Sequence, residues 1–241
     1  MNITIDNLRK DYDGRTVLSI AELTIESGEM VGLVGNNGAG KTTLLRLILD
    51  LVRSSNGMVR IGGNEVSTSE EWKKYSGAYL DEGFLIDYLT PMEFLSLVAA
   101  IRGVGQEGLE DFMGRLGDFV DGEGGVDRKT LIRDLSKGTV QKIGIASALL
   151  GDPRIVLLDE PFANLDPTSQ ALLKEILSCH RQRADALILL SSHNLRHVVD
   201  FCTRIVLLDH GRVVRDVTVG DDNARLLAEL ERFFAVRIRS T

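Results

Sequence analysis

The stretch that most constrains the fold is GNNGAGKT at Gly35–Thr42, which lies between the apolar run MVGLV and the leucine-rich run LLRLILDLV. It fits the pattern G-x-x-x-x-G-K-[ST], in which glycines let the backbone curl until its N–H groups point inward at phosphates. The helix that follows adds about half a positive charge at its N-terminus. A glycine turn that precedes a lysine by chance is the alternative, but the position between a buried strand and a helix argues against it.

The side chains of this segment are suited to a nucleoside triphosphate with its metal ion. Lys41 would place a full charge at the β and γ phosphates, and the hydroxyl of Thr42 would face Mg²⁺. We therefore expect a phosphate loop at Gly35–Thr43 that binds a nucleoside triphosphate through Gly35, Asn36, Asn37, Gly38, Ala39, Gly40, Lys41, Thr42 and Thr43.

The rest of the chain alternates apolar runs with helical patterns, which predicts an α/β fold with a mostly parallel central sheet covered on both faces. Ligands bind such sheets at the carboxyl ends of strands, here after Val34, Asp159 and Ser191. The segments NITIDNLRKDY and RTVLSIAELTI flank an Asp-Gly turn, which predicts an antiparallel β subdomain near the N-terminus.

From about Thr90 the pattern becomes helical. Thr90, Pro91 and Glu93 form a capping box with proline at the first helical position, and we interpret 90–150 as an inserted helical lobe. The expected organisation is a P-loop NTPase domain at 1–216, followed by an amphipathic helix and tail at 217–241. This helix could pack on its own domain or join a dimer contact.

Charge and cysteine usage narrow the class of function. The 28 basic and 35 acidic residues give a net charge of −7, which argues against a nucleic-acid partner. Cys179 and Cys202 have no metal-ligand spacing, so a reducing, cytoplasmic setting is expected. The opening MNITIDNLRK alternates like a half-buried strand and not like a signal peptide. Apolar runs such as ALILL are short, so any membrane association would depend on a partner.

The hexapeptide RIVLLD occurs twice, at Arg154–Asp159 and Arg204–Asp209, each time as a strand pattern that ends in a carboxylate. A phosphate loop needs a second carboxylate on a neighbouring strand to orient Mg²⁺. Asp159 is followed by Glu160, which could polarise a water molecule, whereas Asp209 is followed by a His-Gly turn. We therefore expect Asp159 to hold the metal and Asp209 to be structural.

Further motifs follow in a recognisable order: KDYDG, GNNGAGKT, LSKGTVQ, LLDEP, ANLDP and LLSSHNL. With them the chain resembles, from about Ile3 to Val214, the nucleotide-binding subunit of an ATP-binding cassette (ABC) transporter. The resemblance implies that Tyr12 stacks on adenine and that His193 hydrogen-bonds the γ-phosphate. Without it, Tyr12 would be an exposed hairpin aromatic and His193 a histidine at a strand end. The remaining histidines are expected at the surface: His180, His197 and His210.

LSKGTVQ resembles the family signature LSGGQ, with Lys137 in place of a glycine and Thr139 in place of glutamine. Ser136 can cap the following helix, whose N-terminus then faces an anion, although an ordinary serine cap would look the same. The resemblance implies a signature of Ser136, Lys137 and Gly138 that meets the γ-phosphate bound by the other subunit, with Asp166 lining the dimer contact.

After GAYL the family carries a glutamine that touches Mg²⁺ and the attacking water, and the alignment places Glu82 there. A carboxylate can still ligate Mg²⁺, which prefers hard oxygens. The expected metal ligands are therefore Thr42, Glu82 and Asp159.

The resemblance implies an ATPase that dimerises around Mg-ATP and powers a membrane transporter. Its partners would be a second nucleotide-binding subunit, identical or different, and a transmembrane permease that holds it at the cytoplasmic face of the membrane. The LSKG form and Glu82 look similar to those of exporter-type cassettes, so the resemblance leans toward an exporter. A cassette ATPase outside transport, a nucleotide-binding regulator without hydrolysis and an unrelated P-loop kinase are the alternatives.

Overall fold

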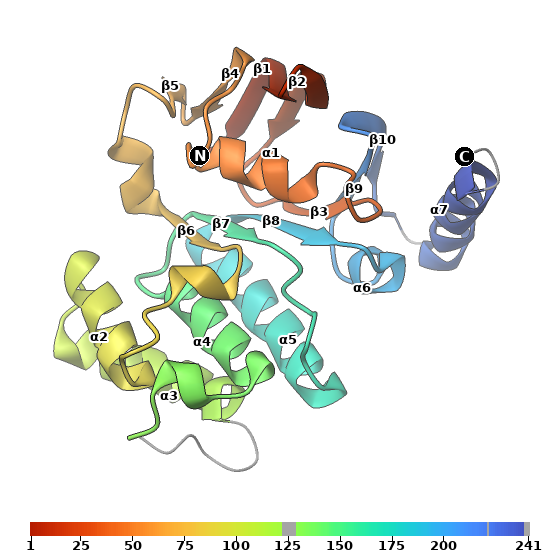
Figure 1. Ribbon diagram of the computed structural model, residues 1–241. Helices are drawn as coiled ribbons and strands as arrows, with labels where there is room; N and C mark the ends of the chain where they lie inside the picture. Colours follow the sequence, from red (N-terminus) through yellow and green to blue (C-terminus); the bar gives the residue numbers. More distant parts are fainter. Residues whose placement is uncertain (122–128, 221, 239–241) are drawn as a thin grey trace.

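The computed structural model describes residues 1–121, 129–220 and 222–238, and Figure 1 shows two sheets stacked above a group of helices. The larger sheet has the strand order β10-β9-β3-β8-β7-β6. All its neighbouring pairs are parallel except β10–β9, which is an antiparallel hairpin. Its strands are β3 (Met30–Val34), β6 (Ser76–Tyr79), β7 (Ile155–Leu158), β8 (Leu187–Ser192), β9 (Arg204–Asp209) and β10 (Arg212–Thr218). The mostly parallel central sheet is therefore confirmed.

The smaller sheet is antiparallel and has the order β2-β1-β4-β5. Its strands are β1 (Ile3–Tyr12), β2 (Arg15–Ile25), β4 (Asn56–Ile61) and β5 (Asn64–Glu65). Asp13 and Gly14 join β1 to β2 with φ angles of 50° and 79°, which a two-residue hairpin turn of this type requires. The Asp-Gly turn and the N-terminal antiparallel β subdomain are confirmed.

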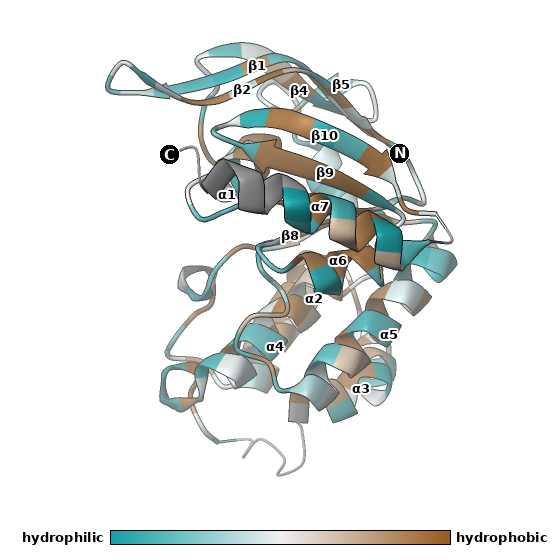
Figure 2. Ribbon diagram, turned by 90° about the vertical axis from the view of Figure 1, so that its right-hand side faces the viewer, coloured by the Kyte–Doolittle hydropathy of each residue, from teal (hydrophilic) through white to brown (hydrophobic). Residues whose placement is uncertain are grey.

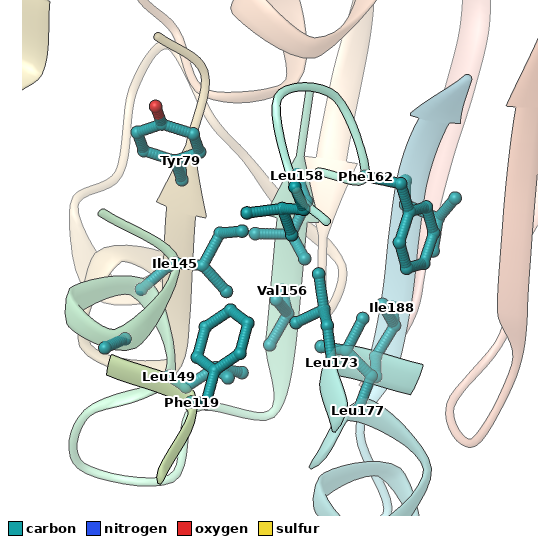
Figure 3. Close-up of a cluster of buried hydrophobic side chains, with 14 of the residues drawn as sticks. Tyr79, Phe119, Ile145, Leu149, Val156, Leu158, Phe162, Leu173, Leu177 and Ile188 are labelled. Carbon is teal, nitrogen blue, oxygen red and sulfur yellow. The ribbon is translucent and has the colours of Figure 1, made fainter. Parts of the chain in front are cut away.

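The larger sheet is buried on both faces because its strands alternate between two hydrophobic clusters. Val31 and Leu33 face the smaller sheet and α1 (Lys41–Ile48), whereas Met30 and Val34 face the helices below. Figure 3 shows the second cluster, in which Val156 and Leu158 of β7 pack against side chains from the helices. This two-sided burial explains why the strand sequences are continuously apolar.

The helices on the other face come mainly from 90–150, the inserted helical lobe predicted from the sequence. They are α2 (Pro91–Ile101), α3 (Gln106–Asp121) and α4 (Lys137–Leu149), and α5 (Pro167–Ala184) lies beside them. At the start of α2 the Thr90 hydroxyl accepts from the Glu93 N–H at 3.3 Å, while the Glu93 carboxylate accepts from the Thr90 N–H at 2.8 Å. The capping box is therefore present. Part of the glycine-broken stretch, 122–128, lies outside the described residues.

Helix α4 lies directly on β6, with almost no side chain between the two backbones. A Cβ atom at Gly77 would lie 1.8 Å from the carbonyl oxygen of Ala148, and one at Gly144 would lie 2.2 Å from the Tyr79 ring. Any larger residue at either position would force the helix away from the strand. This close approach joins the helical lobe to the edge of the central sheet.

The C-terminal segment contains the helix expected there, α7 (Asn223–Ile238). Figure 2 shows α7 next to α6 (Leu195–Val199). Leu230 is buried, and Arg196 of α6 lies 3.8 Å from the Glu231 carboxylate. This helix thus packs on its own chain. Among the described residues, no helix combines the length and the apolar character needed to cross a lipid bilayer.

Candidate active site

The phosphate loop connects the end of β3 to the start of α1, as the sequence predicts. Gly38 and Gly40 have φ angles of 80° and 104°, which side-chain-bearing residues rarely adopt, so the curl of the loop depends on them. The loop borders a cavity of about 250 Å³. The cavity is lined by Val17, Asn36, Asn37, Gly38, Ala39, Gly40, Lys41, Thr42, Thr43, Asp159 and Glu160. Gly35 does not line the cavity, but its carbonyl accepts a hydrogen bond from the Lys41 ammonium.

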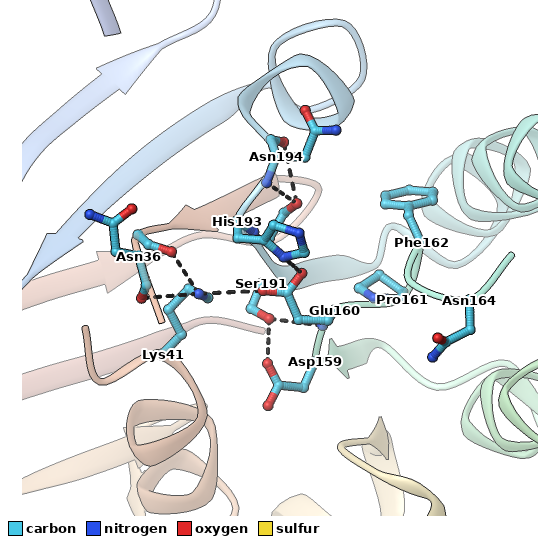
Figure 4. Close-up of polar contacts among 12 residues, drawn as sticks. Asn36, Lys41, Asp159, Glu160, Pro161, Phe162, Asn164, Ser191, His193 and Asn194 are labelled. Carbon is cyan, nitrogen blue, oxygen red and sulfur yellow. Dashed lines mark hydrogen bonds and ion pairs between the residues drawn. The ribbon is translucent and has the colours of Figure 1, made fainter. Parts of the chain in front are cut away.

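Lys41 brings its charge into this cavity although only 6% of its surface is exposed. Its ammonium donates to the Gly35 carbonyl at 2.7 Å and to that of Asn36 at 3.5 Å. It also lies 3.3 Å from Oε1 of Glu160 (Figure 4). A buried ammonium held by neutral carbonyls and one carboxylate is well placed to exchange that carboxylate for a phosphate.

Thr42 and Asp159 supply two hard oxygen atoms at one edge of the cavity. The Thr42 hydroxyl donates to Oδ2 of Asp159 at 2.5 Å. The hydroxyl of Ser191, at the end of β8, donates to Oδ1 of the same carboxylate and so fixes its orientation. Since β7 and β8 are parallel neighbours, both side chains reach the same edge of the sheet.

Glu160 follows Asp159 directly and has a φ angle of 47°, in the left-handed region. Its N–H donates to the Ser191 hydroxyl at 2.8 Å. Its Oε2 lies 2.8 Å from Nδ1 of His193 and accepts from the His193 backbone N–H at 3.3 Å (Figure 4). An ionised carboxylate only accepts, so Nδ1 carries the proton in this contact and Nε2 is available to another group.

The signature residues lie outside this cavity. Ser136 is the N-cap of α4, where its hydroxyl accepts from the Thr139 N–H at 3.2 Å. Ser136 and Lys137 are exposed and Gly138 is partly exposed, and none of the three lines the cavity of their own chain. The serine cap predicted from the sequence is confirmed, and the cap leaves the first turn of the helix open to a ligand from outside.

Asp166 is the N-cap of α5. It accepts from the Ser169 N–H at 2.9 Å and from the Ser169 hydroxyl at 2.5 Å, and these bonds lower the pKa of the Asp166 carboxyl. The carboxylate is therefore ionised and exposed at the surface. Its predicted contact with a second subunit stays a prediction.

Tyr12, Glu82 and His193 do not line the cavity, although His193 contacts Glu160, which does. Tyr12 is 45% exposed at the end of β1, and the Lys10 ammonium lies 4.6 Å from its ring centroid. Glu82 is exposed and begins the short 3₁₀ helix η2 (Glu82–Phe84). Its neighbour Asp81 instead reaches α1, with Oδ2 lying 3.4 Å from Nη2 of Arg46. Adenine stacking by Tyr12 and metal ligation by Glu82 stay predictions.

The buried Tyr79 side chain shows the local effect of these acids. Burial, together with the nearby carboxylates of Glu82 and Asp81, raises the pKa of Tyr79 to about 12. The phenol therefore stays neutral beside the cavity and acts as a packing group.

The sequence reasoning missed Ser191 and Gln141 as site residues. Gln141 is buried in α4, and its side-chain amide donates to the carbonyls of Glu160 and Pro161 at 3.2 and 2.8 Å. The available signal was a glutamine that lies two residues before the mostly apolar helix sequence IGIASALL. A polar side chain that such a helix buries needs hydrogen-bond partners.

The surface prediction for the other histidines is wrong for His180. This side chain is 3% exposed, and its Nε2 bonds the Pro153 carbonyl at 2.9 Å. Burial lowers the pKa of His180 and, with Lys174 and His193 nearby, that of His197. His197 is half-buried and stacks on Phe162 at a centroid distance of 5.4 Å, whereas His210 is exposed as predicted.

The described residues contain no cluster of three or more His, Cys, Asp or Glu side chains placed to hold a metal ion. The donor set at Thr42 and Asp159 nevertheless fits Mg²⁺, which takes one or two protein oxygens and completes its shell with phosphate and water.

Comparison with known proteins agrees with this geometry. A family profile described as ABC transporter matches residues 18–163. The chain is 34% identical to the lipopolysaccharide export ATP-binding protein of Haemophilus influenzae, covering 88% of each chain. It is 33% identical to the tungstate uptake ATP-binding protein of Peptoclostridium acidaminophilum, covering 88% of this chain and 97% of that one. It spans only 54% and 65% of two uncharacterised ABC transporter ATP-binding proteins from Synechocystis and Nostoc.

Solved structures give the same fold. The ATP-binding subunit of an ABC transporter superposes with a TM-score of 0.83 at 29% identity and covers 94% of this chain and 93% of that one. A bacterial ABC transporter cassette solved as a dimer gives 0.81 at 24% identity, over 90% and 99%, and supports the fold alone. With its phosphate loop, its Asp159–Glu160 pair and these relatives, the chain belongs to the ABC transporter family.

Proposed function

We propose that this chain binds Mg-ATP, dimerises around it and hydrolyses it to power a membrane transporter. The single observation that carries the proposal is the network joining Lys41, Glu160 and His193 at the mouth of the phosphate loop. Lys41 and Glu160 line the cavity, and His193 bonds the Glu160 carboxylate. A cation for the phosphates and a carboxylate that can position water are groups that phosphoryl transfer to water uses.

In this mechanism Glu160 orients the attacking water and accepts its proton, and the imidazole of His193 holds the carboxylate in place. The Lys41 ammonium, which pairs with Glu160 at 3.3 Å here, turns to the β and γ phosphates when the triphosphate enters the loop. The backbone N–H groups of the loop offset further negative charge.

Mg²⁺ would be held by Thr42 and Asp159, whose oxygens lie 2.5 Å apart, with Glu82 proposed as an outer ligand. When bound, the ion would offset the negative charge of the triphosphate. Ser191 keeps the Asp159 carboxylate facing that position.

The proposed dimer follows from the position of the signature. Ser136, Lys137 and Gly138 do not line the cavity of their own chain, and we propose that they complete the site of a second subunit. Nucleotide that contacts both surfaces would shift the population to the closed dimer. Asp166 and Tyr12 are proposed to join this interface and the adenine site respectively.

A transmembrane permease is the proposed second partner and would hold the chain at the cytoplasmic face of the membrane. Phe84, Ile86 and Tyr88 are exposed in the segment between β6 and α2, with exposed fractions of 52%, 43% and 73%. Large apolar side chains gathered at a surface segment favour a protein contact there. The names of the relatives include both an export and an uptake system, so the proposal names a transporter without a direction.

The test compares Glu160→Gln with the wild-type chain in Mg-ATP. Because the amide is a poor base, turnover should fall by ~10²–10⁴-fold while ATP still binds, and a nucleotide-bound dimer should accumulate in size-exclusion chromatography. Lys41→Ala is the matched variant on the other side of the same ion pair, and it should weaken ATP binding itself.

Two results would contradict the proposal. One is a Glu160→Gln chain that stays monomeric in Mg-ATP while binding nucleotide. The other is an unchanged ATP affinity in Lys41→Ala, which would show that the phosphate loop does not bind the nucleotide through Lys41.

A further inference from the structure

The buried amide of Gln141 touches the catalytic segment from a different helix. Gln141 is 4% exposed, and its Nε2 donates to two consecutive carbonyls, those of Glu160 at 3.2 Å and Pro161 at 2.8 Å. Its Oε1 accepts from Nδ2 of Asn164 at 3.2 Å. With the amide reversed, its oxygen would face two carbonyl oxygens, so the chemistry of the partners fixes its orientation.

The backbone that Gln141 holds is strained. Glu160 has a φ angle of 47°, which a non-glycine residue keeps only when its surroundings enforce it. Its N–H donates to the Ser191 hydroxyl, and its C=O accepts from Gln141 at 3.2 Å and from the Ala163 N–H of the same loop at 3.0 Å. Each peptide group that flanks its Cα therefore has one side-chain partner from outside the loop. The direction of the Glu160 side chain depends on this backbone conformation.

The same loop is packed against the signature. A Cβ atom at Gly138 would lie 2.7 Å from the carbonyl oxygen of Asn164, so the first turn of α4 rests on the loop backbone. Gln141 lies one turn further along α4, and its bonds attach this turn to the residues that follow Asp159. Within α4, the Gln141 side chain is thus the group that bonds directly to the Glu160 backbone from next to the signature turn.

We propose that Gln141 is a positioning residue, which fixes the strained Glu160 backbone and couples it to the Ser136–Gly138 turn of α4. This inference rests on the proposed function. A chain's own carboxylate is thereby linked to the signature that it offers to the second subunit, so each site responds to the occupancy of the other.

The test uses Gln141→Leu, which keeps the approximate volume and removes the hydrogen bonds. Misplacement of a catalytic group should lower kcat by about tenfold while the KM for Mg-ATP stays near that of the wild type. Gln170→Leu is the matched control, because the Gln170 amide in α5 donates to Phe162 and Leu165 of the same loop at 3.1 and 3.0 Å without touching Glu160. Its kcat should fall by less than about twofold.

A second variant covers the case in which Gln141→Leu does not fold. Asn164→Gly keeps the left-handed backbone at 164 and removes one of the bonds that orient the Gln141 amide, so kcat should fall about two- to threefold at constant KM. Unchanged kcat in folded Gln141→Leu, or equal losses in Gln141→Leu and Gln170→Leu, would overturn the inference. So would unchanged kcat in Asn164→Gly. A wild-type chain without turnover would instead contradict the proposed function.

Discussion

The two copies of RIVLLD fold into strands of the same sheet and then serve opposite purposes. The first copy, Arg154–Asp159, forms β7 and delivers Asp159 to the phosphate loop. The second copy, Arg204–Asp209, forms β9 and ends in a hairpin turn at His210 and Gly211. Six identical residues therefore determine a buried strand, and the neighbouring strands determine what its ends do.

The two carboxylates differ because their strands have different neighbours. β7 lies between β6 and β8, both parallel to it, so its carboxyl end opens onto the edge where the ligand site lies. β9 pairs with the antiparallel β10, and Asp209 lies opposite Arg212 in the ladder. A chain that turns straight back leaves no space for a ligand at that strand end.

The arginines that begin the two copies also differ, but here the second copy has the more extensive contacts. Arg154 is exposed, and its backbone carbonyl accepts from Leu187 at 2.9 Å. Arg204 binds the carboxylates of Asp216 and Glu29 at 2.7 and 3.0 Å and the Thr24 carbonyl at 2.8 Å. These hydrogen bonds raise the pKa of Arg204. The first copy thus places its carboxyl end at the phosphate loop, and the second copy holds its amino end in a network of ion pairs.

The largest expected effect is a difference in ATP turnover between variants of Asp159 and Asp209, the two aspartates that end the copies. Asp159→Asn should lower ATP turnover by about 10²–10³-fold, as expected for the loss of one charged group in an active site. Asp209→Asn is the matched control in the identical hexapeptide and should change turnover by less than about twofold. Steady-state phosphate release measures both. Comparable losses in the two variants would show that the carboxyl end of β9 also belongs to the site.

The next effect concerns the two arginines and is measured by urea unfolding. Arg204→Gln should lower the free energy of unfolding by about 1–3 kcal/mol, because the Asp216 and Glu29 carboxylates lose their cationic partner and the Thr24 carbonyl loses a donor. Arg154→Gln should stay within about 0.5 kcal/mol of the wild type. If Arg154→Gln were the more destabilising variant, the assignment of stability to the second copy would be wrong.

The smallest expected effect is a pH dependence of the free energy of unfolding. It arises at the residue that precedes the first copy and has no counterpart at the second. Nε2 of His180 donates to the carbonyl of Pro153, the residue just before Arg154. At the matching position before Arg204, the Thr203 hydroxyl accepts from the Met30 N–H and donates to the Met30 carbonyl. Burial lowers the pKa of His180 from 6.5, so below about that pH the unfolded chain binds a proton more readily than the folded one. The stability that the neutral, buried His180 contributes is therefore fully present above pH 6.5, and it is lost as the pH falls from 6.5 toward the lower pKa of the folded chain.

His180→Gln keeps a donor for Pro153 and cannot titrate. Urea unfolding at neutral pH and at successive steps below pH 6.5 should show the wild-type chain losing stability relative to this variant. Parallel pH profiles for the two chains would rule out His180 as the origin of the dependence.

The elements that were predictable from the sequence carry local signals. The phosphate loop needs glycines at fixed positions, and the helix starts at Thr90 and Ser136 carry their own caps, so both appear directly in the residue order. The buried strands follow from apolar runs such as IVLL, because both faces of the sheet are covered.

The rest depends on contacts between distant segments. Glu160 has a left-handed φ, and its carbonyl accepts from Gln141, which lies 19 positions earlier in the chain. His180 was expected at the surface because no sequence signal shows that the Pro153 carbonyl needs a donor. In the loop after β6, one position separates Glu82, which is exposed, from Asp81, which reaches Arg46. Sequence reasoning resolves loop registers poorly since no periodicity constrains them.

The glycine seam between α4 and β6 has a consequence for how this chain can diversify. Gly77 and Gly144 leave no room for even a methyl group, so random mutagenesis with selection for activity should return glycine at both positions. Neighbouring exposed positions of the lobe, such as Leu97 and Ile101, carry no such restriction. New partner specificities can therefore evolve on the outer surface of the lobe while its attachment to the sheet is inherited unchanged.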